Sequence, residues 1–450
     1  MIRQPFTALP IGLLAILLGT LPSVAEDARH LSLAEAQQEA VAQAYAVQGA
    51  EHSLEIARGT RRQSLSTLLP TIRIGEEWVR TDDAVGAFGT RLRQERFTQA
   101  DFAIAALNEP KAITDVRTTI EIQQPLFSGG AHLARRRAAG EAEQVAQAQL
   151  ERTRQHVQFA TARAYWGLVL ATEALSVATA GVEAAQGHAH RAAAAWRAGS
   201  VPRSQVLAAQ LRVAELEAGR IDAEHQQAQA ADGLTLLLGW PAGAPIAPSD
   251  LLSSSDLLSS TDESPAHSNM QTRADERALD AQRRAARHMV RGARAGYLPQ
   301  INAFARYAWD AEDPFGKDGE AWMAGASLSW SVFDGFLTQG SVQRARAAAA
   351  QVDVALHELR DRISREIRDA QRQLRAAQQR SQVATAALAN AEEHLRVSRV
   401  EFEEGILTTT QLLDAEVAWR TARTRHLQAL HDIKVNLARR DYVAGAPVNR

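Results

Sequence analysis

The chain has no cysteine, few aromatic residues and almost no net charge, and each of these deficits excludes a class of protein. Without a thiol it can form no disulfide framework, no thiolate metal site and no lipid anchor on an N-terminal cysteine. A net charge of −2 over 450 residues leaves no basic excess for general nucleic-acid binding. Aromatic residues make up only 5% of the chain, so the alanine-, glutamine-, glutamate- and arginine-rich sequence predicts long helices with thin seams.

Long hydrophobic runs are also lacking after residue 25, so we expect no transmembrane helix in the rest of the chain. Before that point, Arg3, the apolar stretch from Ile11 to Leu21 and the small residues Ser23-Val24-Ala25 have the order of a secretory signal peptide. About eleven apolar residues are too few to cross a bilayer as a helix. We therefore expect residues 1–25 to direct export and to be removed, and any later entry into a membrane to be made by β-strands.

The second half of the chain repeats the first half at a spacing of 206 residues. The sequence Phe127-Ser128-Gly129 returns as Phe333-Asp334-Gly335, Gly199 returns as Gly405, and Gly239 returns as Gly445. Three anchors in one register indicate an internal duplication. We therefore divide the mature chain into a first repeat at 26–241, an inter-repeat linker at 242–267, a second repeat at 268–445 and a C-terminal tail at 446–450.

Each repeat has the same predicted order of helix, two strands around a loop, long helix, glycine turn and returning helix. The expected helices are about 33–68, 131–198 and 203–238 in the first repeat, and about 269–295, 339–404 and 408–442 in the second. The expected strands are about 71–80, 117–127, 301–310 and 322–333. Apolar and alanine positions three and four residues apart between Val352 and Ala377 predict a coiled coil. Because the two shorter helices together roughly match the long one in length in the first repeat, and less closely in the second, we expect them to stack end to end beside it.

The predicted strands are apolar on one side and polar on the other. Ile72, Ile74 and Trp78 alternate with Arg73 and Glu77, and the strands near 117–127 and 322–333 show the same period of two, whereas the strand near 301–310 shows it imperfectly. Strands of about ten residues with this pattern fit a transmembrane barrel with a wet lumen, although a soluble half-buried sheet would have the same alternation. The export signal and the long helices favour the membrane. The aromatic residues expected at its interfaces are Trp78, Tyr307, Trp309, Trp322 and Trp330.

Four strands are too few to enclose a channel, because the small transmembrane barrels have about eight. The chain must therefore associate if it forms a pore. A dimer would give a barrel with a plugged interior, whereas a trimer would leave room for a lumen. The strand pattern by itself does not choose between them.

Several short motifs resemble the TolC-like outer membrane efflux proteins, over about Leu31 to Gly445. Leu69-Pro70 and Leu298-Pro299 stand before the first strand of each repeat, and the sequence from Gln124 to Gly130 marks a strand-to-helix junction. The segments after Gly199 and Gly405 are similar to the family's pattern of glycine followed by Val-Leu-x-Ala-Gln, the second more loosely. The loop from Phe88 to Pro110 looks like one branch of the family.

This resemblance implies a fold that is mainly α with transmembrane β: an antiparallel coiled-coil α-barrel joined to a twelve-stranded β-barrel, with four strands from each subunit of a homotrimer. Such proteins lie in the outer membrane, contact its lipid and extend into the periplasm. They have no catalytic centre and no cofactor. They act as exit ducts in efflux or type I secretion, reached through a periplasmic adaptor protein from an inner-membrane transporter of the resistance-nodulation-division or ABC type.

The resemblance also assigns the two glycine turns to the periplasmic end, where an adaptor would contact them. We expect Gly199 and Gly405 to be left-handed, each ending one helix shortly before the next begins. Exposed Ser200, Val201, Ile406 and Leu407 would add a partly apolar surface, although a helical hairpin without a partner would show the same turn. The candidate contact residues are Gly199, Ser200, Val201, Gln205, Val206, Leu207, Gly405, Ile406, Leu407, Gln411, Leu412 and Leu413.

Asp414 matches an acidic position that can line the closed tunnel aperture in members of the family, and Gln411 stands one turn earlier where some relatives have a second acid. Threefold symmetry would gather three carboxylates, raise their pKa by mutual repulsion and attract cations. A solvated helical aspartate is the alternative interpretation. Gln205 and Leu407 replace polar or charged residues that hold the tip closed in some relatives.

The remaining candidates favour structure over chemistry. His188-Ala189-His190 lacks further ligands at metal-site spacing, so we expect it to face solvent. Tyr165-Trp166 favours packing between helices over a platform for cargo. Arg135-Arg136-Arg137 fits lipid head groups and a solvated face equally well. A periplasmic coiled-coil scaffold or adaptor without a pore remains as a second reading, but it would not need duplicated amphipathic strands.

Overall fold

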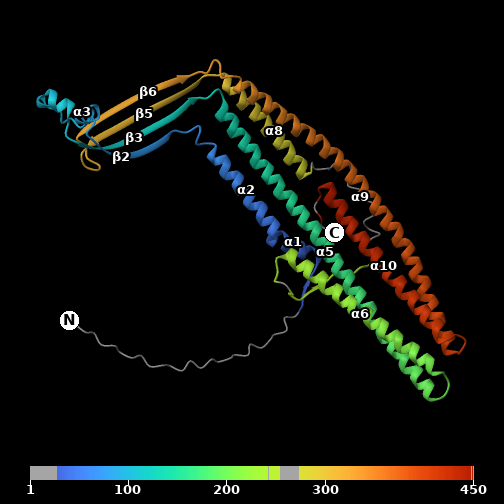
Figure 1. Cartoon of the computed structure of the whole chain (residues 1–450). Coiled ribbons are helices and arrows are strands. Elements are labelled where there is room, and N and C mark those ends of the chain that lie inside the picture. Colours follow the sequence, from blue (N-terminus) through green and yellow to red (C-terminus); the bar gives the residue numbers. More distant parts are fainter. Residues whose placement is uncertain (1–27, 242, 254–272, 447, 449–450) are drawn as a thin grey trace, which may run out of the picture.

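The computed structural model describes residues 28–241, 243–253, 273–446 and 448. The expected signal peptide lies outside this part of the chain, as do residues 254–267 of the expected linker and most of the expected tail. The described residues form a curved four-stranded sheet at one end and a long bundle of helices at the other (Figure 1). We call the end of the sheet that points away from the long helices its distal end.

The helices repeat with the same lengths and the same spacing as the glycine anchors. Helices α5 (Ala131–Arg197) and α9 (Leu337–Glu403) each have 67 residues, and α6 (Arg203–Leu238) and α10 (Thr409–Ala444) each have 36. The six repeated glycines all have φ between 61° and 78°, a left-handed conformation that costs glycine little. They end four helices and turn two strands into helices, which explains why both halves keep them.

The two shorter helical columns stack against the long helices as expected (Figure 1). Helices α1 (Leu33–Gln43), α2 (Tyr45–Gln63) and α6 lie along α5, while α8 (Ala274–Arg294) and α10 lie along α9. Contrary to the expectation that each repeat packs on its own long helix, α8 packs more extensively against α5 than against α9, and α5 also contacts α10, so α5 joins the two repeats. In the predicted seam of α9, Leu356, Ile363 and Ala377 are buried.

The sequence predicts one opening helix over 33–68, but the structure has two helices, α1 and α2, in its place. The helix breaks at Ala44, which has an extended backbone, and it ends at Gln63. The break lets the end of α6 approach closely, because a Cβ at Gly239 would lie 3.3 Å from the carbonyl oxygen of Gln43. Contacts with a distant part of the chain therefore override the helical pattern here.

A small core lies where α1, α5 and α6 meet. Tyr165 is fully buried there, and its hydroxyl lies 2.9 Å from the carbonyl oxygen of Leu31 and 2.8 Å from a carboxylate oxygen of Asp250. These contacts join the strands β1 (Arg29–Leu31) and β4 (Ile246–Pro248), which pair in parallel, to the long helix. Tyr165 and Trp166 thus pack between helices, as predicted.

One helix after residue 25 is apolar enough to cross a membrane, as judged by its length and composition, contrary to the expectation from the sequence. Among the described helices, α5 contains an 18-residue window with a mean hydropathy of 1.4. Only 28% of that window is buried within the single chain. The window belongs to a 67-residue helix that packs along α1, α6 and α10, so its apolar character also fits helix packing.

The sheet has the order β2-β3-β5-β6, and all neighbours are antiparallel. Its strands are β2 (Thr71–Thr81), β3 (Ile113–Phe127), β5 (Gln300–Ala311) and β6 (Gly319–Ser329). The last strand was expected at 322–333, but its ladder ends where Ser329 meets Gln300, because the partner strand begins there after Pro299. Trp330 therefore lies beyond the strand.

Between β2 and β3 the chain forms three short helices, α3 (Ala84–Arg93), η1 (Gln99–Phe102) and α4 (Ile104–Asn108). Another short helix, η3 (Ala295–Tyr297), precedes β5. Figure 1 shows α3 at the distal end of the sheet. The sheet and the helical tips thus lie at opposite ends of the molecule.

Candidate functional site

The strand register separates a mainly apolar face of the sheet, which also carries Glu76 and Glu320, from a mainly polar one. One row across the four strands consists of Ile74, Ile120, Tyr307 and Trp322, and the adjacent row, on the opposite face, consists of Arg73, Glu121, Arg306 and Met323. Ile74 and Trp322 are 75% and 76% exposed. In the polar row, Arg306 pairs with Glu121 at 3.5 Å. A sheet with this division fits a wall between lipid and water.

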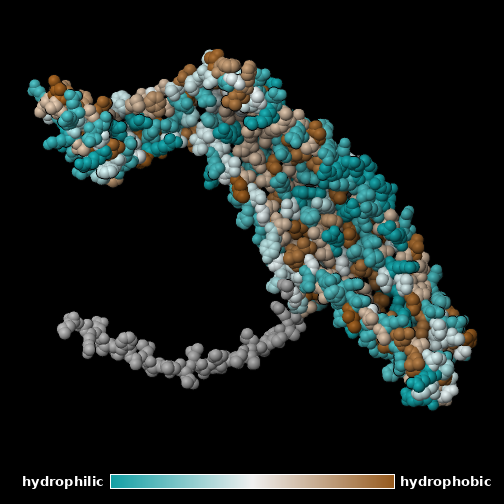
Figure 2. Space-filling view, in the orientation of Figure 1, coloured by the Kyte–Doolittle hydropathy of each residue, from teal (hydrophilic) through white to brown (hydrophobic). Residues whose placement is uncertain are grey.

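The aromatic residues lie at two levels of the apolar face and its border. Trp78, Tyr307, Trp309 and Trp322 occupy the distal half of that face, where the rings of Tyr307 and Trp309 are 4.7 Å apart. Trp330 lies at the other end, and its indole nitrogen donates to the carbonyl oxygen of Tyr297 at 3.1 Å. Figure 2 shows apolar residues gathered at this corner, where the sheet meets the long helices; the exposed ones include Val332, Phe333 and Phe336.

At the opposite end of the molecule, two glycine turns form the tips. Gly199 and Gly405 have φ of 75° and 78°, and nothing surrounds the positions that their Cβ atoms would occupy. Ser200 and Ile406 are exposed, the latter by 67%, whereas Val201 and Leu407 are half-buried, contrary to expectation. The first turn therefore offers less apolar surface than its sequence indicated.

Three of the expected contact residues at the tips have structural roles. Val206 and Leu412 are buried, so they hold the hairpins together and present no surface to a partner. Gln411 completes a capping box with Thr408, whose backbone N–H donates to its side-chain oxygen at 2.9 Å. Leu207 and Asp414 are exposed, while Gln205 and Leu413 are half-buried.

His188 is not on the solvent side, and that expectation is wrong. It is 8% exposed, and its Nε2 lies 2.9 Å from Oε1 of Glu416 on α10. Arg191 donates to Nδ1 at 2.8 Å, which requires the proton on Nε2 and makes His188 the donor to Glu416. This contact joins the two repeats about three helical turns from the tips.

The surroundings of Glu416 are strongly cationic. Arg399 approaches it at 3.9 Å, and Arg420 is close enough to Gly181 that a Cβ there would lie 3.0 Å from its guanidinium. Burial raises the pKa of Glu416, but the hydrogen bond from His188 and the charges of Arg399 and Arg420 lower it more, to below 4.5. Glu416 is therefore the carboxylate that balances this cluster.

With both ends of the molecule described, comparison with known proteins decides the family. A family model described as outer membrane efflux protein matches residues 36–240 and 267–441. The chain belongs to the outer membrane efflux protein family. The family description places it in the outer membrane and assigns it to efflux.

Relatives of this efflux protein family agree in sequence and in fold. Protein CyaE of Bordetella pertussis is 28% identical over 272 residues, which cover 59% of the chain and 56% of that relative. The outer membrane channel CmeC of Campylobacter jejuni aligns with a TM-score of 0.76, 15% identity and 93% and 87% of the two chains covered. The outer membrane protein VceC of Vibrio cholerae aligns with a TM-score of 0.74 and 18% identity, and the alignment covers 93% of this chain and 97% of VceC. The open state of the outer membrane channel MtrE of Neisseria gonorrhoeae aligns with a TM-score of 0.76 and 17% identity, and the alignment covers 93% of this chain and 90% of MtrE.

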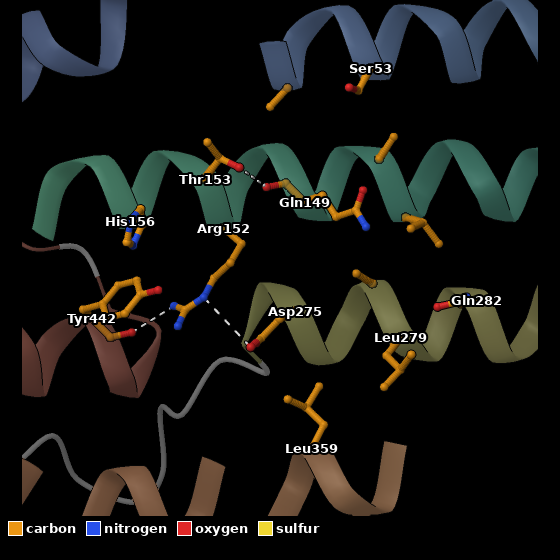
Figure 3. Close-up of a pocket in the computed structure, with 14 residues that line it drawn as sticks. Ser53, Gln149, Arg152, Thr153, His156, Asp275, Leu279, Gln282, Leu359 and Tyr442 are labelled. Atoms are coloured by element: carbon orange, nitrogen blue, oxygen red, sulfur yellow. Dashed lines mark hydrogen bonds and ion pairs between the residues drawn. The ribbon is translucent and has the colours of Figure 1, made fainter. Parts of the chain in front are cut away.

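A polar joint of this outer membrane efflux protein lies midway along the bundle (Figure 1), where α8 begins and α10 ends (Figure 3). A hollow of about 630 Å³ is lined there by residues that include Arg152, Asp275, Leu359 and Tyr442. The guanidinium of Arg152 stacks on the ring of Tyr442 at 3.9 Å and donates to its carbonyl oxygen at 3.0 Å. The charged groups thus pair with one another and with the backbone.

Arg273 completes this joint. It is 6% exposed and donates to Asp275 and to Glu366, both at 2.7 Å, and to the carbonyl oxygen of Val443 at 3.2 Å. Burial raises the pKa of Asp275, but the hydrogen bonds and charge of Arg273, with Arg152, hold it below 3.8. Across residues 28–241, 243–253 and 273–446, no group of three or more His, Asp or Glu is arranged to hold a metal ion.

Sequence reasoning missed both polar clusters. The spacing of Gly181, Ala185 and His188 by four and three residues continues a buried helical face, and this spacing could have indicated that His188 is buried. No comparable signal exists for Arg273, because its partners lie on three different segments.

Proposed function

We propose that three copies of this chain form an outer-membrane exit duct that continues into a periplasmic tunnel. The observation that carries the proposal is the exposed four-stranded sheet, apolar on one face and polar on the other, attached to 67-residue helices. Its strands have 11 to 15 residues, enough to cross the hydrocarbon core at a tilt.

The edges of the sheet support association. In the described part of the chain, β2 and β6 each have a strand on one side only. They run in opposite directions, so β6 of one copy can pair antiparallel with β2 of the next and continue the alternation. Three copies would then close twelve strands, whereas a lone sheet would leave two long unpaired edges.

Cysteine pairs would test this closure cleanly, because the chain has no cysteine of its own. We expect Glu77→Cys on β2, combined in turn with Ala321→Cys, Met323→Cys or Ser327→Cys on β6, to give disulfide-linked chains in oxidised outer membranes for at least one pair. Thr119→Cys on the inner strand β3 replaces Glu77→Cys as the control and should give none. If no combination links two chains, the barrel is not built in this way.

We further propose that the tips receive a periplasmic adaptor, through which an inner-membrane transporter delivers its cargo. The solved channels CmeC and MtrE are named as outer membrane channels, and the match to CyaE covers 56% of that protein. Ser200, Leu207 and Ile406 form the exposed rim of the two turns. This rim and the open space around both glycines favour a contact with other helices.

Arginine at both tip glycines should abolish export while the particle still assembles. Gly199→Arg with Gly405→Arg adds two bulky cations to the tips and about 1 kcal/mol of backbone strain at each site. Assembly would be measured by heat-modifiable migration and export by efflux from cells. Gly219→Arg, at an exposed helical site with open space, is the matched control. Full export by an assembled double variant would rule out the tip contact.

A further inference from the structure

The connection between β2 and β3 is a folded unit to which the proposed duct assigns no role. We call residues 82–112 the distal segment. Its three phenylalanines form a small cluster, with ring centroids 4.9 Å apart for Phe88 and Phe97 and 5.1 Å apart for Phe97 and Phe102. Asp101 caps a short helix and pairs with Arg91. The distal segment therefore holds a defined shape.

One end of the distal segment lies against the polar face of the sheet. The register places Asp115, Arg117 and Asp310 on the same face as Glu121 and Arg306. Arg93, at the end of α3, reaches Asp115 at 3.1 Å and Asp310 at 3.1 Å. Asp310 is 2% exposed and its carboxylate is thus buried, whereas the Arg93 side chain that reaches it is 41% exposed.

Residues next to Arg93 and on the edge strand also keep the distal segment against the polar face of the sheet. The side-chain amide of Gln94, which is also buried, donates to Asp115 at 3.1 Å and to the carbonyl oxygen of Thr114 at 2.8 Å. On the edge strand β6, a Cβ at Gly319 would overlap the carbonyl group of Arg93. Only glycine therefore lets the distal segment lie this close to the sheet.

The other distal connection, between β5 and β6, turns to the opposite face. The backbone N–H of Phe315 donates at 3.2 Å to Glu76, which shares the apolar face with Ile74. A Cβ at Gly316 would likewise meet Ala311 on that face. The two distal connections thus contact opposite faces of the sheet, the distal segment the polar one, although an exposed ion pair between Arg96 and Glu312 joins them at 2.6 Å.

We propose that the distal segment is a lid on the lumen side of the external mouth, which limits the size of solute that passes, with Arg93 as its latch. The inference rests on the proposed duct, in which the polar face encloses water. Three copies of the segment would then converge on the mouth. The exit of the duct would be selective by itself, independently of the helical tips.

The size limit can be measured from outside the cell. Ala308 lies on the polar face, between the rows of Arg306 and Asp310, and Ala308→Cys would be the single thiol of the chain. A small maleimide and one carrying a long polyethylene glycol chain would be added to intact cells, and the labelling rates compared. With the native segment, we expect the small reagent to react and the large one to be excluded.

Releasing the latch should remove this discrimination. We expect Arg93→Ala, and also Gly319→Val, which pushes the segment away, to raise the large-to-small rate ratio severalfold, towards the ratio measured at the exposed position Val85→Cys. A short glycine-serine turn in place of residues 84–110 provides a variant that does not depend on one side chain. Arg96→Ala is the comparison variant, because it removes an exposed ion pair between the distal segment and Glu312 of the β5–β6 connection. Since both of these side chains are about half exposed, we expect it to change the ratio much less than Arg93→Ala does.

The outcomes separate the lid from the duct. If the large reagent reaches Ala308→Cys equally fast with and without the segment, while the particle remains assembled, the lid is refuted and the duct stands. If neither reagent reaches Ala308→Cys in any variant, the polar face does not enclose water and the proposed function itself fails.

Discussion

Replacing Glu416 by alanine is expected to lower the free energy of unfolding by about 3 kcal/mol, because it removes a buried carboxylate that accepts from His188 and faces two arginines. His188 would lose its acceptor at 2.9 Å, and Arg399 and Arg420 would lose the carboxylate whose charge both of them face. Thermal denaturation of the purified protein and hydrogen exchange of amides in α5 and α10 near His188 would both report the change.

Glu393→Ala is the matched control for this variant. Glu393 pairs with Arg396 at 2.7 Å on α9, but both side chains are exposed, so its loss should change little. Glu416→Gln keeps an acceptor for His188 without the charge and should fall between the two. Equal effects of Glu416→Ala and Glu393→Ala, or unchanged exchange near His188, would contradict a link between the repeats.

The sign of the pH dependence follows from the lowered pKa of Glu416. A carboxylate whose pKa is lower in the folded state stabilises the fold at pH values above its ordinary value of 4.5. The stabilisation is lost as the pH falls below 4.5 and through the folded pKa. The stability difference between native protein and Glu416→Ala should therefore be constant in neutral and mildly acidic buffer and disappear only in stronger acid.

Replacing Arg273 by alanine should also cost about 3 kcal/mol, because it breaks a buried ion cluster and uncaps the end of α10. Asp275 and Glu366 would lose their shared partner, and the carbonyl oxygen of Val443 would lose a donor. We expect a lower midpoint in thermal denaturation followed by circular dichroism, at one fixed scan rate. Faster proteolysis in the middle of the bundle should accompany it.

Arg277→Ala is the control on the same helix, one turn further along. Arg277 pairs with Glu151, and both side chains are about half exposed, so the pair should contribute less than about 1 kcal/mol. Arg273→Met retains much of the volume and separates packing from charge. If Arg273→Ala and Arg277→Ala have the same midpoint, the joint does not depend on the buried guanidinium.

Much of the fold could be predicted from local sequence signals. The glycines at fixed spacing marked the ends of the long helices to within a few residues, because only glycine adopts the left-handed turn at low cost. The alternation in β2 identified its two faces, because side chains on a strand point to opposite sides in turn. Both signals depend on residues close together in the chain.

The errors arose where partners are distant in sequence. The break at Ala44 depends on the approach of Gly239, the length of β6 depends on where β5 begins, and the burial of His188 depends on Glu416, 228 residues away. Apart from the helical spacing that places His188 on a buried face of α5, none of these contacts leaves a periodic pattern. The same limit explains why the latch at Arg93 was not foreseen, since Asp310 lies 217 residues away.

The order of strands has a consequence for symmetry. Inside the chain, β3 of the first repeat pairs with β5 of the second, and the free edges β2 and β6 again belong to different repeats. In a closed ring of three such chains, a pair of strands from the first repeat would be followed by a pair from the second all the way round. The ring would then have exact threefold symmetry and approximate sixfold symmetry. A helical partner docking on the hairpins would then meet two kinds of site in equal numbers, one with Gly199 and one with Gly405 at its apex.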